Sequence, residues 1–166
     1  MADDPPADLQ APSSDRRQEV QTRVWLRILS LYGEVFARLN RVLTAEAGVS
    51  LAKFDVLAQL DRFDDGLSLG RLSQNLKVTG GNVSGLVQRL LADGLITREM
   101  SRRDRRSFVV RLTPKGVSVF AAARAAHQRE LSDCFEDMPA ADLDIVLEAL
   151  NGLAAQVHGK TPRVVQ

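Results

Sequence analysis

The chain has 166 residues, 45% of them hydrophobic, which is enough to bury one core and excludes a wholly disordered protein. One cysteine excludes an intrachain disulfide. No apolar run approaches the roughly 18 residues of a membrane span, and the acidic N-terminus excludes a secretory signal, so we expect a cytoplasmic protein with no membrane partner. The net charge of +1 hides a basic centre, because residues 86–115 carry eight bases and three acids. This distribution predicts a local contact with a polyanion.

Prolines and a lack of bulky apolar side chains predict a disordered acidic tail over residues 1–17. Residues 18–48 follow as a predicted long helix, which Gly48 is expected to end. Its apolar side chains step alternately by four and three residues: Trp25, Leu29, Tyr32, Phe36, Leu39 and Leu43. Such a broad seam needs a partner, so we expect this helix to form part of a homodimer.

Residues 49–113 are predicted to form a winged helix-turn-helix. Ser50, Ser68 and Thr79 are expected to cap helices over 51–63, over 69–76 and from 79 to Gly94. Residues 95–100 and 107–112 then predict two strands of a hairpin. Thr113 is expected to cap a helix to about 136, and a last helix is expected over 139–158; residues 114–160 thus complete the dimerisation part. The predicted fold is mainly α with a small β-hairpin wing.

The helix that starts at Thr79 has an unusual outer face, away from its apolar stripe. This face holds Gly80, Gly81, Asn82, Ser84, Gly85, Gln88 and Arg89. Because each interior glycine costs a helix about 1 kcal/mol relative to alanine, three of them favour close approach to a large partner. A helix in the DNA major groove meets that need, and Asn82 and Gln88 can pair with adenine. The alternative is a merely solvated helix face.

The predicted wing loop is dense in arginine. Arg102, Arg103, Arg105 and Arg106 surround Asp104. Guanidinium groups favour the narrow minor groove of A·T-rich DNA, and Asp104 is suited to orient one of them. The alternative is a solvated hairpin tip.

Three further signals point to other chemistry. Gly66 to Gly70 matches the hydrolase motif G-x-S-x-G around Ser68, but no large α/β sheet is expected here, so we predict a helix cap and no enzyme. His127, Glu130 and Cys134 share one helix face, yet structural roles are favoured over a metal site. Cys134 lies among apolar residues and is interpreted as a buried thiol rather than a peroxide sensor. No cofactor is expected.

The stretch 50–116 resembles the DNA-binding core of the MarR (multiple antibiotic resistance regulator) family. The matching motifs are VTGGNVSGLVQRL at 78–90, D-x-R at Asp104 and Arg106, and V-x-LT-x-x-G at 110–116. The resemblance implies a homodimeric repressor that binds a pseudo-palindromic operator in double-stranded DNA and is released by a small ligand. The expected DNA-binding residues are Ser68, Thr79, Gly80, Gly81, Asn82, Ser84, Gln88, Arg89, Arg103, Asp104, Arg105 and Arg106.

The first helix is similar to that of regulators that sense hydroxycinnamoyl-CoA thioesters. This resemblance implies an aromatic carboxylate or its CoA thioester as effector. The candidate ligand-binding residues are Trp25, Arg27, Tyr32, Arg38 and Arg41, since arginine suits carboxylates and phosphates. The alternatives are a dimer core for the aromatic residues and a solvated flank for the arginines. The alternative function is a constitutive or architectural DNA-binding protein without an effector.

Overall fold

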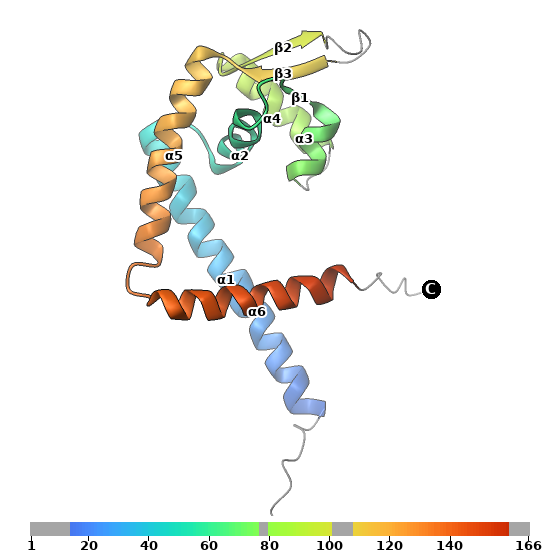
Figure 1. Ribbon diagram of the computed structural model, residues 1–166, viewed down its shortest axis with the longest axis vertical. Coiled ribbons are helices and arrows are strands. Elements are labelled where there is room, and N and C mark those ends of the chain that lie inside the picture. Colours follow the sequence, from blue (N-terminus) through green and yellow to red (C-terminus); the bar gives the residue numbers. More distant parts are fainter. Residues whose placement is uncertain (1–13, 77–79, 101–107, 160–166) are drawn as a thin grey trace, which may run out of the picture. The chain divides into compact units, whose positions relative to one another are not determined.

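The computed structural model describes residues 14–76, 80–100 and 108–159 (Figure 1). In chain order the elements are α1 (Ser14–Ala47), α2 (Leu51–Asp61), β1 (Leu67–Ser68), α3 (Leu69–Leu76), α4 (Gly80–Ala92), β2 (Ile96–Met100), β3 (Phe108–Leu112), α5 (Pro114–Cys134) and α6 (Ala140–His158). The fold is mainly α with a small antiparallel sheet, which confirms the predicted fold class. The chain divides after Leu131 into two compact units, so α6 belongs to the second. Within the described ranges, no helix is long and apolar enough to cross a membrane.

The first helix starts earlier than the sequence predicts. α1 begins at Ser14, so the predicted disordered tail over residues 1–17 is wrong for residues 14–17. This first turn is polar, and Asp15 there interacts favourably with the helix dipole. The apolar pattern begins only at Val20, and for this reason it located the start too late. Residues 1–13 lie outside the described ranges.

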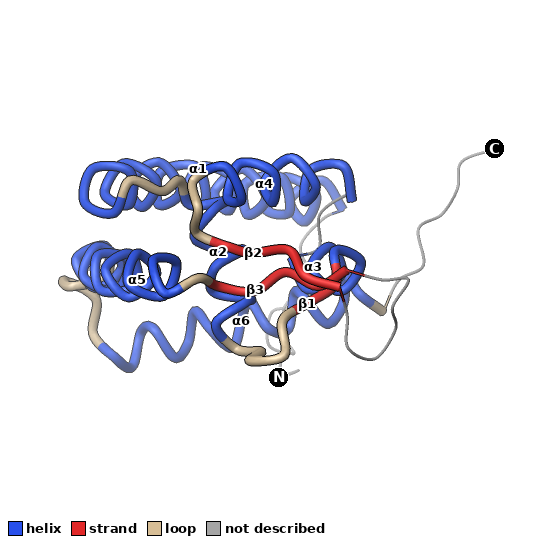
Figure 2. Tube along the Cα trace, turned by 90° about the horizontal axis from the view of Figure 1, so that it is seen from above, coloured by secondary structure: helices blue, strands red, loops and turns tan. Residues whose placement is uncertain are grey.

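The sheet has three strands in the order β1-β3-β2, one more than the predicted hairpin. β2 pairs antiparallel with β3, with Ile96 opposite Leu112. β1 is only two residues long and pairs with the other edge of β3, with Leu67 opposite Val110. Figure 2 shows the three strands side by side. Since β1 leads directly into α3, its pairing with β3 joins the helix-turn-helix to the hairpin.

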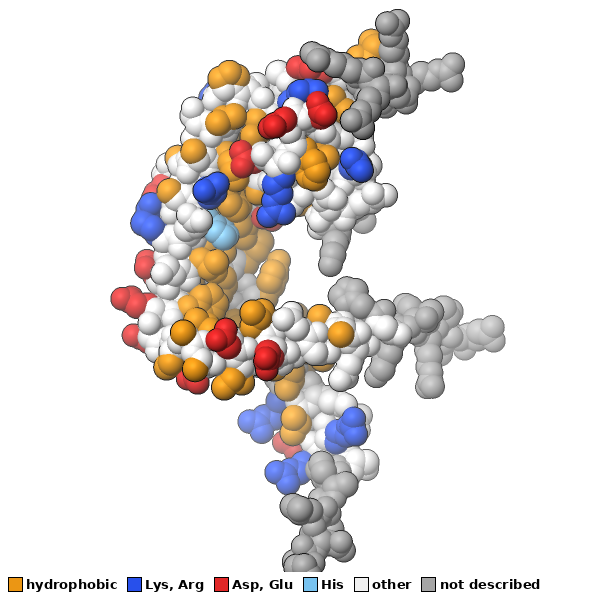
Figure 3. Space-filling model, in the orientation of Figure 1, with side chains coloured by type: hydrophobic (Ala, Val, Ile, Leu, Met, Phe, Trp, Pro, Cys, Tyr) orange, Lys and Arg blue, Asp and Glu red, His pale blue; other side chains and the backbone are white. Residues whose placement is uncertain are grey.

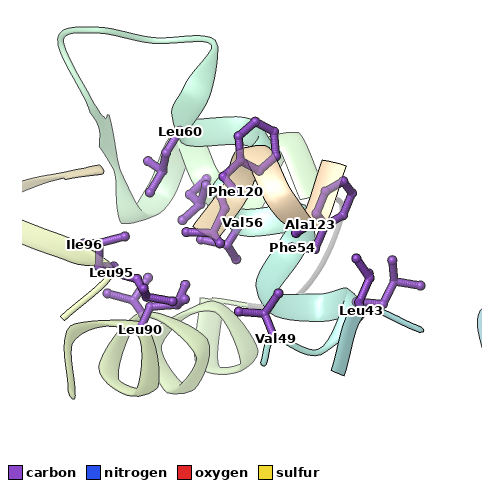
Figure 4. Packing of buried hydrophobic residues seen from close by; sticks show 14 of the residues in the cluster. Leu43, Val49, Phe54, Val56, Leu60, Leu90, Leu95, Ile96, Phe120 and Ala123 are labelled. Atoms are coloured by element: carbon purple, nitrogen blue, oxygen red, sulfur yellow. The ribbon is translucent and has the colours of Figure 1, made fainter. Parts of the chain in front are cut away.

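The core of the first unit gathers apolar side chains from α1, α2, α4, α5 and the sheet (Figure 4). Leu43 at the end of α1 and Val56 in α2 are both fully buried. Ala58 of the same helix is only partly buried. α2 is covered on several sides, because it contacts α1, α3, α4 and β3.

Helix caps follow the sequence closely. The Ser50 hydroxyl accepts a hydrogen bond from the Lys53 N–H at 3.3 Å, and the Thr113 hydroxyl accepts one from the Gly116 N–H at 2.9 Å. Both predicted N-caps are therefore confirmed, and each satisfies a backbone donor that the first helical turn leaves free.

The junction between α4 and α5 is closely hydrogen-bonded. Gly94 has a φ of 70° and ends α4 as predicted, since glycine adopts this conformation without strain. The Thr113 N–H donates to the Leu95 carbonyl at 3.0 Å, and its hydroxyl donates to the Gly94 carbonyl at 2.8 Å. Lys115 Nζ donates to the Asp93 carbonyl at 2.8 Å. The start of α5 is thus fixed to the end of α4.

Candidate nucleic-acid interface

The two faces of α4 have opposite characters. Val83, Val87 and Leu90 are buried and anchor the helix on the core. The other face is exposed, and it holds Gly80, Gly81, Asn82, Ser84, Gln88 and Arg89. Within the described part of the chain, the side-chain amides of Asn82 and Gln88 have no hydrogen-bond partner. The anchored helix therefore presents donor and acceptor groups to an external partner.

Gly80 and Gly81 have no packing role inside the chain. A Cβ atom built at either position meets nothing within 4 Å. Both residues are helical, so neither needs the positive φ that favours glycine. Because a glycine inside a helix lowers its stability relative to alanine, the glycine at position 81 favours an external surface that approaches the backbone closely.

Two other residues of this face also have contacts within α4. The Ser84 hydroxyl donates to the Gly80 carbonyl at 3.0 Å, which leaves its oxygen lone pairs as acceptors. The Arg89 guanidinium lies back along the helix, with Nη1 3.6 Å from the Cβ position of half-buried Gly85. Arg89 is exposed, so its charge remains available at the surface.

Five of the predicted DNA-binding residues lie outside the described ranges: Thr79, Arg103, Asp104, Arg105 and Arg106. The structure describes the hairpin on both sides of the arginine cluster, up to Met100 and from Phe108. The DNA-binding roles of these five residues stay predictions.

Ser68 is a structural residue at the start of α3. Its hydroxyl accepts a hydrogen bond from the Arg71 N–H at 3.3 Å, which confirms the predicted cap. The element before this motif is helix α2, and the two-residue strand β1 lies inside the motif and ends at Ser68. The sheet nevertheless is small and antiparallel, unlike the sheet that a nucleophile elbow requires.

The structure does not bring the five predicted ligand residues together. Trp25, Arg27, Tyr32, Arg38 and Arg41 all lie on α1 and extend over about 24 Å of the helix. Trp25 and Tyr32 are 58% and 65% exposed. Arg38 Nε pairs with Glu130 Oε1 of α5 at 2.6 Å. The five residues thus lie along one helix rather than around one cavity, and their ligand-binding roles stay predictions.

A cleft of about 410 Å³ between α2, α3 and α5 was not predicted. Its aromatic wall stacks Phe54 against His127 and Phe120, with ring centroids 4.8 Å and 5.6 Å from that of Phe54. The polar lining side chains are Asp55, Gln59, Asp61, Arg62 and Arg124. Because these residues come from helices far apart in the sequence, no local motif indicates the cleft.

Asp55 in this cleft is expected to make the stability of the protein depend on pH. Burial raises the pKa of its carboxyl group, and the nearby charge of His127 partly opposes this rise. Between the unfolded and folded pKa values the folded state binds more protons, so the free energy of unfolding falls as pH rises. Asp55→Asn is therefore expected to raise Tm near neutral pH and to lose that gain at acidic pH, as measured by thermal unfolding. Asp61→Asn, which removes another carboxylate of the cleft on α2, is the control, and an equal gain for both variants at every pH would contradict the assignment.

The face with His127, Glu130 and Cys134 shows structural contacts. His127 stacks on Phe54, and Glu130 pairs with Arg38. Across the described residues, no three His, Cys, Asp or Glu side chains are grouped to hold a metal ion. Cys134 is half-buried, and its interpretation as a structural thiol stays a prediction.

Comparisons with known proteins agree with this architecture. A family model described as the MarR family matches residues 47–107. The crystal structure of a MarR family transcriptional regulator from Silicibacter pomeroyi is 47% identical, covering 85% of this chain and 97% of that chain, with a TM-score of 0.75. The transcriptional activatory protein BadR from Rhodopseudomonas palustris is 30% identical over 110 residues, which are 65% of this chain. The chain spans 62% of the length of BadR.

Two more distant solved structures share the fold. A mutant MarR from E. coli, solved in complex with operator DNA, is 20% identical, with a TM-score of 0.72 and coverage of 79% of this chain and 93% of that chain. CouR from Rhodococcus jostii RHA1, solved with bound p-coumaroyl-CoA, is 21% identical, with a TM-score of 0.70 and coverage of 95% and 99%.

The identity of 47% with the Silicibacter pomeroyi protein extends over nearly all of that chain and therefore indicates more than a shared fold. Proteins of this family regulate transcription, so the hydrolase interpretation of Ser68 is excluded. As the motifs at 78–90 and 110–116 predicted, the chain belongs to the MarR family of DNA-binding transcriptional regulators.

Proposed function

We propose that the protein is a homodimeric, ligand-responsive repressor that binds a pseudo-palindromic DNA operator through α4 and the hairpin wing. The observation that carries the proposal is the exposed face of α4, with two glycines that no internal contact requires and two unpaired amides among the described residues. Arginines between β2 and β3 add charge for the flanking minor groove. The complex of E. coli MarR with operator DNA supports this use of the fold.

Exposed apolar side chains support the homodimer. In a single copy of the chain, the seam residues Trp25, Leu29, Tyr32 and Phe36 of α1 are between 39% and 65% exposed. On the N-terminal half of α1, hydrophobic side chains lie beside basic ones at the surface (Figure 3). The second unit has its own exposed set on α6: Ile145, Val146, Leu147, Leu150, Leu153 and Val157. Contiguous apolar patches mark protein interfaces, and a second copy of the chain is the partner that buries both sets.

The cleft beside α5 is the proposed effector site. Its volume of about 410 Å³ lies in the range of small-molecule pockets. Phe54 and His127 offer flat walls to an aromatic ring, and Arg62 and Arg124 offer cationic partners to a carboxylate or phosphate. The complex of CouR with p-coumaroyl-CoA supports an aromatic acid or its CoA thioester as the ligand class. The arginines of α1 are the alternative location.

The DNA part of the proposal is tested on a duplex that the wild-type protein selects from a random DNA pool. Since a bidentate amide–adenine contact is worth about 1–3 kcal/mol, Asn82→Ala is expected to weaken binding at least about fivefold in fluorescence anisotropy. Gln128→Ala, an exposed amide on α5, is the control and should bind as the wild type does. Equal affinity of the Asn82 variant would contradict the role of α4.

The effector part is tested by thermal unfolding with a panel of aromatic acids and their CoA thioesters. A ligand that binds the folded protein raises Tm, and a true effector also releases the duplex because it prefers the DNA-incompetent form. Arg124→Gln should remove the Tm shift and keep duplex binding. A panel in which no compound raises Tm or releases DNA favours the alternative, a constitutive DNA-binding protein.

A further inference from the structure

The last turn of α3 lies at the cleft between α2 and α5. The side-chain amide of Asn75 in this turn donates a hydrogen bond to Oε1 of Gln59 on α2 at 3.1 Å. Gln59 itself lines the cleft. Leu76, the final residue of α3, also lines the cleft and is partly buried against the core. A hydrogen bond and an apolar side chain thus place the end of α3 at the surface where the effector is proposed to bind.

The start and the middle of α3 are anchored on the sheet and the core. Ser68 caps the first turn, and Leu67 directly before it pairs with Val110 of β3. Leu72, in the middle of the helix, is fully buried. A change in the cleft therefore acts first on the last turn of α3, because the other two turns are held elsewhere.

The last turn of α3 is followed closely by the proposed DNA-binding helix. α4 begins at Gly80, four positions after Leu76, and α3 contacts α4 (Figure 1). The first turn of α4 carries Gly81 and Asn82, which belong to the proposed DNA-binding face. Since so short a connection has a limited reach, the position of Leu76 restricts the position of this turn.

A ligand in the cleft would cover the Gln59 side chain. Asp55, Gln59 and Arg62 step by four and three residues along α2 and its C-cap, so they are neighbours on one face of the helix. An aromatic ligand that lies on Phe54 and pairs with Arg62 therefore passes over the Gln59 amide. A polar group of this ligand then competes with Asn75 for the hydrogen bond of Gln59.

We propose that the Gln59–Asn75 hydrogen bond and Leu76 couple the cleft to DNA binding. This inference rests on the proposed function and names the residues through which the effector acts. In the ligand-free protein the hydrogen bond fixes the end of α3 and so holds the first turn of α4 in the form that binds DNA. A ligand that takes Gln59 from Asn75 and displaces Leu76 releases this turn. The three residues are positioning residues, which act through α4 rather than by contact with DNA.

The first test breaks the hydrogen bond in the full-length protein without any ligand. Gln59→Ala and Asn75→Ala are each expected to weaken anisotropy-measured binding of the selected duplex about threefold, because the end of α3 must then be ordered when DNA binds. The double variant should lose no more than either single variant, since both remove the same bond. Gln128→Ala on α5 is again the control. Wild-type affinity of Gln59→Ala overturns the proposal, and so do losses that add up, because Asn75 then acts on DNA by another route.

The second test fills the cleft with a side chain in place of a ligand. Ala58 lines the cleft next to Gln59 in the sequence, so a phenylalanine there occupies space that Leu76 also lines. Ala58→Phe is expected to weaken duplex binding about tenfold, within the usual size of an allosteric coupling. Adding Asn75→Ala should then cost nothing further, because the hydrogen bond is already broken. Ala58→Ser leaves the cleft open and is the control, and Ala58→Leu replaces the phenylalanine variant if circular dichroism shows that it folds poorly.

The outcomes separate the coupling from the proposed function. A folded Ala58→Phe protein that binds the duplex weakly supports the coupling, even where no aromatic acid or thioester of the panel raises Tm. Wild-type affinity of both cleft-filling variants, while Asn82→Ala binds weakly, overturns the coupling alone. A panel compound that releases the duplex equally well from the wild type and from Asn75→Ala also overturns the coupling and leaves the effector site in place. A wild-type protein that binds no DNA overturns both proposals.

Discussion

Alanine in place of Gly116 is expected to lower the free energy of unfolding by about 3 kcal/mol, at the upper end of the usual cost of overpacking. A Cβ atom at this position would lie 1.9 Å from the backbone carbonyl oxygen of Leu95 and 3.0 Å from its carbonyl carbon. The obstacle is backbone that Thr113 holds by a hydrogen bond of 3.0 Å, so it cannot turn aside as a flexible side chain does. The clash therefore strains the junction between α4 and α5.

Urea unfolding followed by circular dichroism measures this loss as a lower midpoint. Gly70→Ala is the matched control, because a Cβ atom on this α3 residue meets nothing within 4 Å. It is expected to raise the free energy of unfolding by about 0.4–1 kcal/mol, since alanine restricts the unfolded chain. Equal midpoints for the Gly116 variant and the wild type would contradict this prediction, because the backbone at Leu95 would then accommodate the Cβ atom without loss of stability.

Gly81→Ala is expected to change stability and DNA binding in opposite directions. The free energy of unfolding should rise by about 0.4–1 kcal/mol, because the position is helical and open. Affinity for the selected duplex should fall by about tenfold or more, because the new methyl group keeps the α4 backbone from its DNA partner. A variant that is more stable but binds DNA more weakly cannot owe the weaker binding to misfolding, so this substitution tests the contact between α4 and DNA directly.

Thermal unfolding and anisotropy on the same preparation provide both readouts. Gly152→Ala on α6 is the control, with open space around its Cβ position and no place in the proposed DNA surface. It should gain stability and bind DNA as the wild type does. If the Gly81→Ala protein is more stable and also binds DNA as the wild type does, the α4 backbone does not approach DNA closely at this position.

Local features were predictable because their causes are local. The caps at Ser50, Ser68 and Thr113 each depend on one hydroxyl and an N–H three residues later. The positive φ of Gly48 and Gly94 likewise follows from helix ends in which only glycine is unstrained. The α4 face was predicted for the same reason, since a helical period places its residues.

Features with distant causes were missed. β1 has two residues and exists through its pairing with β3 about forty positions later, so no alternating pattern marks it. Arg38 pairs with Glu130, 92 residues away in the sequence, and no local pattern indicates this contact. The cleft joins Phe54 to Phe120 and His127 in the same way. Helical periods show which side of a helix is polar, but they do not show which helices meet.

The hydrogen bonds at the junction of α4 and α5 have a mechanical consequence. α5 has 21 residues and is about 32 Å long, and its start is hydrogen-bonded to the residues at the end of α4. Farther along, it meets α1 through exposed ion pairs such as Arg129–Glu46, which contribute about 1 kcal/mol or less. Between these points Phe120, Ala123 and Ala126 pack α5 into the core, so a tilt of α5 by about 5°, which would displace its far end by about 3 Å, would have to be shared with the helices it packs on. α5 therefore connects the cleft at Phe120 and His127 to the end of α4, the helix that we propose binds DNA.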